Sequence, residues 1–87
     1  MNEAEKEVFE KLKADFLRIK KKSKLNSADE EQLNTDITGM LGLFAVIPEL
    51  IIADYAEKMI SFGEEKLLAM QGHRIQFDKL KRKHKIR

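Results

Sequence analysis

The sequence predicts an all-α protein, folded as an antiparallel hairpin or bundle of three helices, with four helices as the alternative. Apolar residues recur at intervals of three and four along most of the chain, whereas strand-like alternation never extends beyond four residues. Of the 87 residues, 43% are hydrophobic, which is enough for one small core. We therefore expect residues 1–87 to form a single helical domain, with a basic C-terminal segment, residues 73–87, that is partly flexible.

A first helix is predicted over residues 2–25. Its apolar residues trace one helical face in steps of three and four: Val8, Phe9, Leu12, Phe16 and Ile19, with Leu17 beside them. Acidic side chains crowd the beginning of this segment and basic side chains crowd its end, which suits the dipole of a helix. The pattern stops at Asn26.

A second helix is predicted to begin at Ser27, because Ser27 and Glu30 have the spacing of a capping box. Its apolar face consists of Leu33, Ile37, Met40, Leu41 and Phe44. Gly39 and Gly42 lie inside this helix, where each costs about 1 kcal/mol relative to alanine. We expect these glycines to allow the close approach of a neighbouring helix, with a local kink as the alternative.

Pro48 marks the next boundary, because proline restricts the residue before it and fits the first turn of a helix. Val46 and Ile47 are expected to form a short apolar turn, which is followed by a third helix from Pro48. The apolar positions of this helix are Ile51, Ile52, Tyr55, Ala56, Met59, Ile60 and Phe62.

The end of the third helix depends on Gly63. Residues 61–64 have the spacing of another capping box, which would open a new helix. The apolar spacing nevertheless continues to Met70 with no proline in between, so we favour one continuous helix that ends with Gly72 as its cap. Three structures remain open for residues 75–86: a short helix, the end of the third helix, or a frayed tail.

Charge is segregated along the chain, although the formal net charge is only +2. Residues 1–25 carry eight basic and five acidic side chains. Residues 26–65 carry one basic and nine acidic side chains, and residues 66–87 carry eight basic and one acidic side chain. An acidic middle therefore lies between two basic ends. With three helices the two densest basic runs would meet at one end of the bundle, and with four they would lie at opposite ends.

These two basic runs are the candidate sites for an anionic partner, such as the backbone of a nucleic acid. Basic side chains at helix ends are also ordinary solvated charge, and this explanation is preferred for the first run. The two explanations are even for the second, where six of residues 79–87 are Lys or Arg. The candidates are Lys20, Lys21, Lys22, Lys24, Lys79, Lys81, Arg82, Lys83, Lys85 and Arg87.

The predicted hairpin of the second and third helices is apolar nearly all round, and one amphipathic helix covers only part of it. A second copy of the chain would cover the rest, so we expect a homodimer. The interface candidates are Met40, Leu41, Leu43, Phe44, Ile47, Ile51, Ile52 and Tyr55.

No constellation of residues points to catalysis. The chain has no Cys, and His73 and His84 lack partners at the spacing of a metal site, so no metal or cofactor is expected. Glu49 and Asp54 are the acids with a case for a perturbed pKa, because they stand in the most apolar stretch, but a structural role is preferred for both. We expect a protein that is not an enzyme.

The expected function is that of a small regulatory protein of the cytoplasm, a homodimer that binds the nucleic acid backbone through its basic ends. The absence of Cys from so small a domain favours a reducing compartment. The most apolar window, residues 37–56, contains a proline and two acids, so no transmembrane span is expected. Peripheral contact of the basic C-terminal segment with anionic lipid stays open.

The alternative is a protein–protein interaction module. In its length, its lack of Cys and its charged C-terminal tail, the chain is similar to the small helical bundles that protect bacteria from their own bacteriocins. This architectural resemblance implies an immunity-type module that sits at a membrane surface or on a partner protein.

Overall fold

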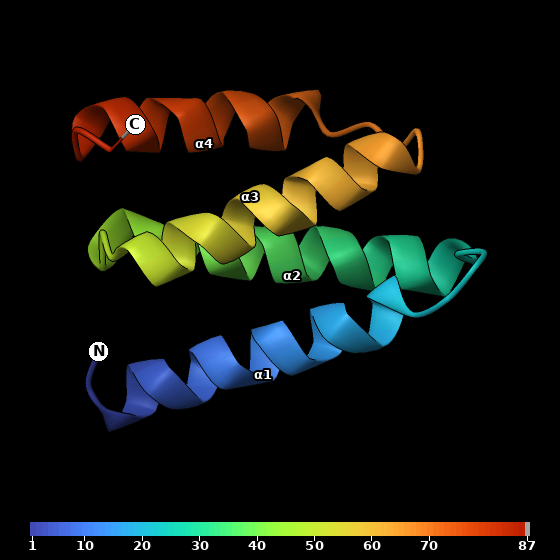
Figure 1. The fold of residues 1–87 in the computed structure, drawn as a ribbon, viewed down its shortest axis with the longest axis horizontal. Helices are drawn as coiled ribbons and strands as arrows, with labels where there is room; N and C mark the ends of the chain where they lie inside the picture. The colour runs from blue at the N-terminus through green and yellow to red at the C-terminus, as the bar shows by residue number, and fades with distance from the viewer. Residues whose placement is uncertain (87) are drawn as a thin grey trace.

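The computed structural model describes residues 1–86, and over this range the chain forms four antiparallel helices joined by short loops (Figure 1). They are α1 (Glu3–Lys20), α2 (Ser27–Val46), α3 (Leu50–Glu65) and α4 (Gln71–Lys83). The all-α class and the bundle architecture are therefore confirmed. None of these helices is long and apolar enough to span a membrane, within the described residues.

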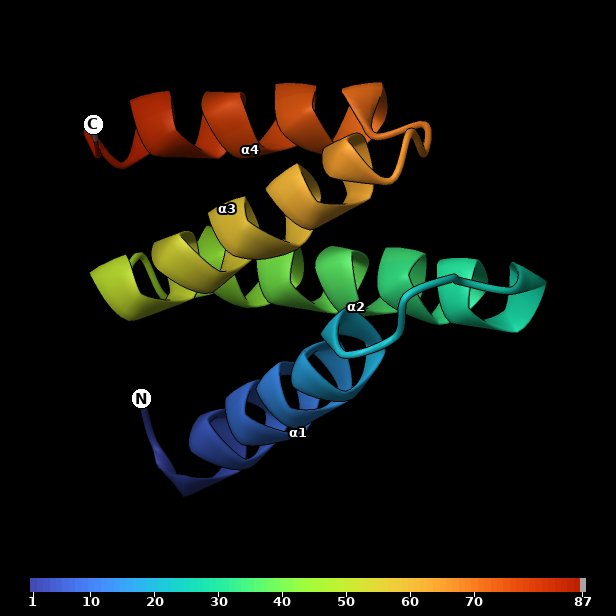
Figure 2. The same ribbon diagram turned by 45° about the vertical axis from the view of Figure 1, so that its right-hand side comes forward.

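The α2–α3 hairpin is the centre of the bundle. Each of these two helices packs against all the other helices, whereas α1 and α4 lie on opposite sides of the hairpin (Figures 1 and 2). α1 contributes Phe9, Phe16 and Ile19 to the core, and α4 contributes Phe77. The apolar hairpin is thus covered on both sides by the same chain.

The predicted apolar faces of the three helices are largely confirmed. All five residues proposed for the face of α2 are fully buried, and most of those proposed for α1 and α3 lie in or against the same core. Val8 and Ile51 are exceptions, because both side chains are about half exposed. Edge-to-face contacts between Phe16 and Phe62, with ring centroids 5.8 Å apart, join α1 to α3.

The starts of α1 and α2 are both fixed by an asparagine. The side chain of Asn26 accepts a hydrogen bond from the Asp29 amide at 2.8 Å, and the Asp29 carboxylate accepts one from the Asn26 amide at 3.2 Å. The capping box was expected one residue later, at Ser27 and Glu30. Asn2 and Glu5 form the same reciprocal pair before α1.

Other boundaries differ by a few residues from those predicted. α1 ends at Lys20 rather than at residue 25, since the lysine-rich segment that follows has no apolar residue to bury until Leu25. α2 ends at Val46, so this residue belongs to the helix and not, as predicted, to the turn with Ile47. α3 starts at Leu50 with Glu49 as its N-cap, so Pro48 lies just before the helix instead of in its first turn.

The predicted continuation of the third helix through Gly63 to Gly72 is wrong, and so is the alternative of a new helix opened by residues 61–64. α3 runs past Gly63 and ends at Glu65 in a Schellman motif, in which the Leu68 amide donates to the Gly63 carbonyl at 3.0 Å. The left-handed position of this motif is occupied by Leu67, with φ 62°. Gly72 is in the first turn of α4.

Leu67 destabilises the fold at this position, because a leucine rarely adopts the left-handed conformation. A left-handed backbone conformation destabilises a residue with a Cβ atom by roughly 1–2 kcal/mol. The Leu67 side chain is 92% exposed, so its packing offsets little of this free energy. We expect Leu67→Gly to raise the free energy of unfolding by about 1 kcal/mol in urea denaturation. Leu67→Ala is the control, because it removes the exposed side chain and keeps the Cβ atom. Equal stability of the two variants would contradict this explanation.

The two glycines of α2 have different surroundings. A Cβ atom on Gly39 would lie 3.1 Å from both methyl groups of Leu12, so the close approach of α1 is confirmed there. Gly42 has nothing within 4 Å of such an atom, and the same explanation is wrong for it. Gly63, for which no close approach was predicted, packs directly under Met70.

Candidate binding surface

The two basic runs lie at opposite ends of the bundle. α1 and α3 run in one direction and α2 and α4 in the other, so the end of α1 and the end of α4 are separated by the length of the bundle (Figures 1 and 2). A fused basic surface, which would have required three helices, does not form. Each run must therefore be judged as a separate site.

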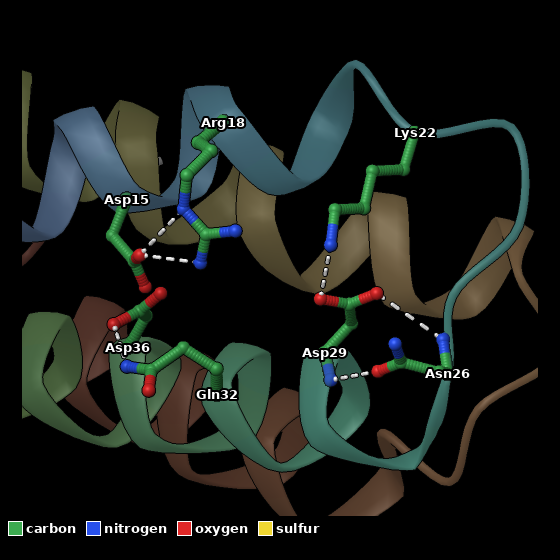
Figure 3. Close-up of polar contacts among 7 residues, drawn as sticks. All are labelled: Asp15, Arg18, Lys22, Asn26, Asp29, Gln32 and Asp36. Atoms are coloured by element: carbon green, nitrogen blue, oxygen red, sulfur yellow. Dashed lines mark hydrogen bonds and ion pairs between the residues drawn. The ribbon is translucent and has the colours of Figure 1, made fainter.

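The first run, defined as the α1–α2 basic cluster (Lys20, Lys21, Lys22 and Lys24), faces acidic partners. Lys22 binds the Asp29 carboxylate at 2.7 Å (Figure 3). The hydrogen bond from Lys22, together with that from the Asn26 amide, lowers the pKa of Asp29. The cluster thus abuts the acidic start of α2, and intramolecular pairing accounts for part of its charge.

The second run, defined as the C-terminal basic cluster (Lys79, Lys81, Arg82, Lys83 and Lys85), is on the last two turns of α4 and the loop after it. Lys81 approaches Asp78 at 4.0 Å and lies over the Phe77 ring. The other four side chains are exposed, and none of them makes a salt bridge within residues 1–86. Arg87, the last candidate, lies outside the described residues.

The end of α4 is held in a defined position. The Ile86 amide donates to the Lys81 carbonyl at 2.8 Å, and Lys85 adopts the left-handed conformation with φ 57°. The Ile86 side chain packs against the core, which fixes the basic residues around it relative to the bundle.

An exposed apolar turn adjoins this cluster. The turn between α2 and α3 presents Val46, Leu50 and Ile51, with exposed fractions of 76%, 67% and 46%, and Pro48 is exposed between them. A cavity of about 100 Å³ joins the turn to α4. It is lined by apolar residues together with one basic and two acidic residues: Leu50, Ala53, Asp54, Glu57, Phe77, Lys81 and Ile86. We define the docking end as this apolar turn together with the C-terminal basic cluster.

Arg74 joins α4 to α3 by ion pairs, which position the C-terminal basic cluster of α4 relative to the rest of the bundle. Its guanidinium group binds Glu57 at 2.7 Å and Glu64 at 2.7 Å. Burial acts to raise the pKa of Glu57, but Arg74 and Ser61 outweigh it and the pKa is lowered; the Arg74 hydrogen bond likewise lowers the pKa of Glu64.

Several of the dimer-interface candidates are core residues of the single chain. Met40, Leu41, Phe44 and Ile52 have no exposed area, because α1 and α4 cover the hairpin that a second copy was expected to cover. Leu43, Ile47 and Tyr55 are partly buried against this core. Ile51 alone in the set is exposed.

The residues singled out for chemistry have structural surroundings. Glu49 is the N-cap of α3 and binds the ammonium group of Met1 at 3.0 Å, and Asp54 is exposed. His73 lies 2.9 Å from the Asn34 side chain, and burial lowers its pKa. Among residues 1–86, no group of three His, Cys, Asp or Glu side chains is placed to hold a metal ion.

One acidic pair, Asp15 on α1 and Asp36 on α2, was not predicted from the sequence. A signal was present, because Asp36 follows Leu33 by three residues and precedes Met40 by four, which places it on the apolar face. Its side chain is indeed buried between the two helices.

Comparisons with known proteins add no relative: no protein family, no curated protein and no solved structure matches the chain. The surface described above is therefore the basis for assigning a function.

Proposed function

We propose that this protein is a non-enzymatic binding module that docks on an anionic membrane surface at the cytoplasmic side, through the docking end of its bundle. The observation that carries the proposal is that the exposed aliphatic side chains of the α2–α3 turn lie at the same end of the bundle as four exposed basic side chains that make no salt bridge within residues 1–86. Leu50 and Lys81 line one cavity there. Aliphatic side chains enter the interfacial region of a bilayer, while Lys and Arg bind its anionic headgroups.

The energetics require both parts of the docking end. Four exposed basic side chains contribute about 4 kcal/mol at an anionic surface, which by itself corresponds to a dissociation constant near ~1 mM. Transfer of Val46, Leu50 and Ile51 adds up to about 1.5–3 kcal/mol for each side chain that is fully buried. The combination supports reversible binding in the micromolar range.

A nucleic acid is less well supported as the partner. Base stacking needs exposed aromatic rings, and Phe77, the aromatic residue within the C-terminal basic cluster, is buried. Exposed aliphatic residues also gain nothing from a phosphate backbone. The separation of the two basic clusters further reduces the positive field that a duplex would meet.

Co-sedimentation with phosphatidylcholine vesicles, prepared with and without phosphatidylserine, tests the proposal. We expect binding only to the anionic vesicles, and a marked loss of binding between roughly 50 and 200 mM salt. The double variants Val46→Ser/Leu50→Ser and Arg82→Glu/Lys83→Glu should each weaken binding at least about tenfold.

Matched controls come from the opposite end of the bundle. Leu67→Ser removes an aliphatic side chain that is even more exposed than Val46 and Leu50. Lys21→Glu/Lys24→Glu reverses two exposed charges of the α1–α2 basic cluster. These variants should bind vesicles like the wild type. Equal loss in both sets would refute the proposal. Gel shift of duplex DNA without vesicle binding would assign the surface to nucleic acid, and dimer formation without vesicle binding would assign it to a second copy.

A further inference from the structure

Two carboxyl groups face each other between α1 and α2. Figure 3 shows the Asp15 and Asp36 side chains pointing toward one another, each with its Oδ2 atom on the near side. Oδ1 of Asp15 accepts from the Arg18 guanidinium at 2.8 Å, and Oδ1 of Asp36 accepts from the Gln32 amide at 3.1 Å. Both Oδ2 atoms are buried and have no hydrogen-bond donor within the described residues.

Two ionised carboxylates are unstable in this arrangement, because like charges repel and neither inner oxygen has a donor. One proton resolves both problems, since a protonated carboxyl group donates a hydrogen bond that the ionised partner accepts. Only 2% of the Asp36 surface is exposed, and Arg18 holds the charge of Asp15, so the proton belongs on Asp36.

We propose that Asp15 and Asp36 share one proton and form a pH-sensitive latch that holds α1 against α2. The latch is closed when the proton is bound and opens when both carboxyl groups are ionised. The two carboxyl groups line a cavity of about 320 Å³ together with Lys11, Leu12 and Thr35. This cavity gives solvent a route to the pair. The proposal is independent of the membrane-binding function above.

The groups that act on this pair come from α1 and α2. Burial, followed by the hydrogen bond to Asp15, raises the pKa of Asp36 to about 7, while Gln32 and Arg18 oppose the shift. A hydrogen bond from the protonated Asp36 has the largest effect on Asp15 and lowers its pKa; burial opposes this shift, and Arg18 adds to it. Lys11 lines the same cavity, and the Lys22–Asp29 ion pair lies further along the interface.

The pH dependence follows from the direction of the Asp36 shift. A carboxyl group with a raised pKa binds a proton more tightly in the folded state, so its stabilising effect is complete below the unfolded pKa of 3.8. The effect is lost as the pH rises through about 7. Asp29 has a lowered pKa and therefore acts in the opposite direction, losing its stabilising effect as the pH falls.

The test compares the melting temperature of the wild type with that of Asp36→Asn, from about pH 5 to about pH 8. The amide cannot ionise, and it donates to Asp15 at every pH. We expect the advantage of the variant in melting temperature to grow by roughly 5–15 °C between about pH 5 and about pH 8. His73, whose pKa is lowered by burial, is present in both proteins, so its contribution cancels in the difference.

Asp15→Asn separates a shared proton from simple burial of Asp36. If the proton is shared, this variant loses the part of the pH dependence that Asp15 causes and keeps the part that burial causes, because an amide replaces the repelling carboxylate. Full pH dependence in Asp15→Asn would overturn the shared-proton latch. Asp29→Asn is the matched control, since it neutralises another buried aspartate of α2 and should lose stability near neutral pH.

Carboxyl ¹³C NMR provides a readout that does not depend on stability. We expect the Asp36 signal to titrate near pH 7 and to be perturbed again when Asp15 titrates at low pH. Titration of both groups in a single step below about pH 5 would show that no proton is held between them, and would reject the proposal.

Discussion

Phe44→Ala is expected to lower the free energy of unfolding by about 3–5 kcal/mol. The Phe44 side chain is fully buried on α2, and its ring centroid lies 5.7 Å from that of Phe77 on α4 and 5.5 Å from that of His84. A domain of this length has a total stability of about 4–13 kcal/mol, so the loss is a large part of it. Urea denaturation followed by circular dichroism measures the change.

Val46→Ala is the control for this substitution. Val46 is on the same helix and 76% exposed, so its truncation should change the stability by no more than about 0.5 kcal/mol. A Phe44→Ala variant as stable as Val46→Ala would show that α4 does not depend on the aromatic contact with α2.

Gly63→Ala is expected to destabilise the protein by about 1–3 kcal/mol, although alanine is the better helix former. A Cβ atom on Gly63 would lie 2.6 Å from Sδ and 2.8 Å from Cγ of Met70. Met70 is buried and follows directly on the α3–α4 loop, so its side chain has little room to move away. Thermal denaturation measures the loss.

Gly42→Ala is the matched substitution with the opposite expected sign. Gly42 is exposed near the C-terminal end of α2, and nothing lies within 4 Å of the added atom. Alanine should therefore stabilise the helix by about 0.5–1 kcal/mol. If both alanine variants are stabilised, the contact between Gly63 and Met70 is not a tight one.

Periodicity predicts the faces of helices better than it predicts their ends. The apolar spacing identified all the buried apolar residues of α2, because burial follows directly from the position of a residue around the helix axis. The break after Glu65 was missed, since Leu67 occupies a left-handed position that is usually marked by glycine. The spacing around Gly63 continues across this break and so conceals it.

The presence of a glycine in a helix did not predict whether a neighbouring helix packs against it. Gly39 and Gly42 have the same local pattern in the sequence, yet only Gly39 faces α1. The difference depends on which side of α2 the first helix packs against, and this is a property of the tertiary arrangement.

The candidate site could be predicted only in part. The basic residues near the C-terminus are visible in the sequence, and the dependence of their position on the number of helices could be stated in advance. Their proximity to Val46 and Leu50 could not, because it arises from the fourth helix folding back along the third. Asp54 was a candidate for a perturbed pKa because it stands in the most apolar stretch, but it is exposed in the fold. Asp36, in a less apolar stretch, is the aspartate that is buried.

The antiparallel arrangement of an even number of helices has a practical consequence. The start of α1 and the end of α4 lie at the same end of the bundle, which is also the docking end (Figure 1). An affinity tag or fluorophore on either terminus would stand beside the surface that we propose for membrane binding, and an N-terminal tag would also remove the ammonium group that binds Glu49. Leu67, at the far end and almost fully exposed, is the better attachment point for a label.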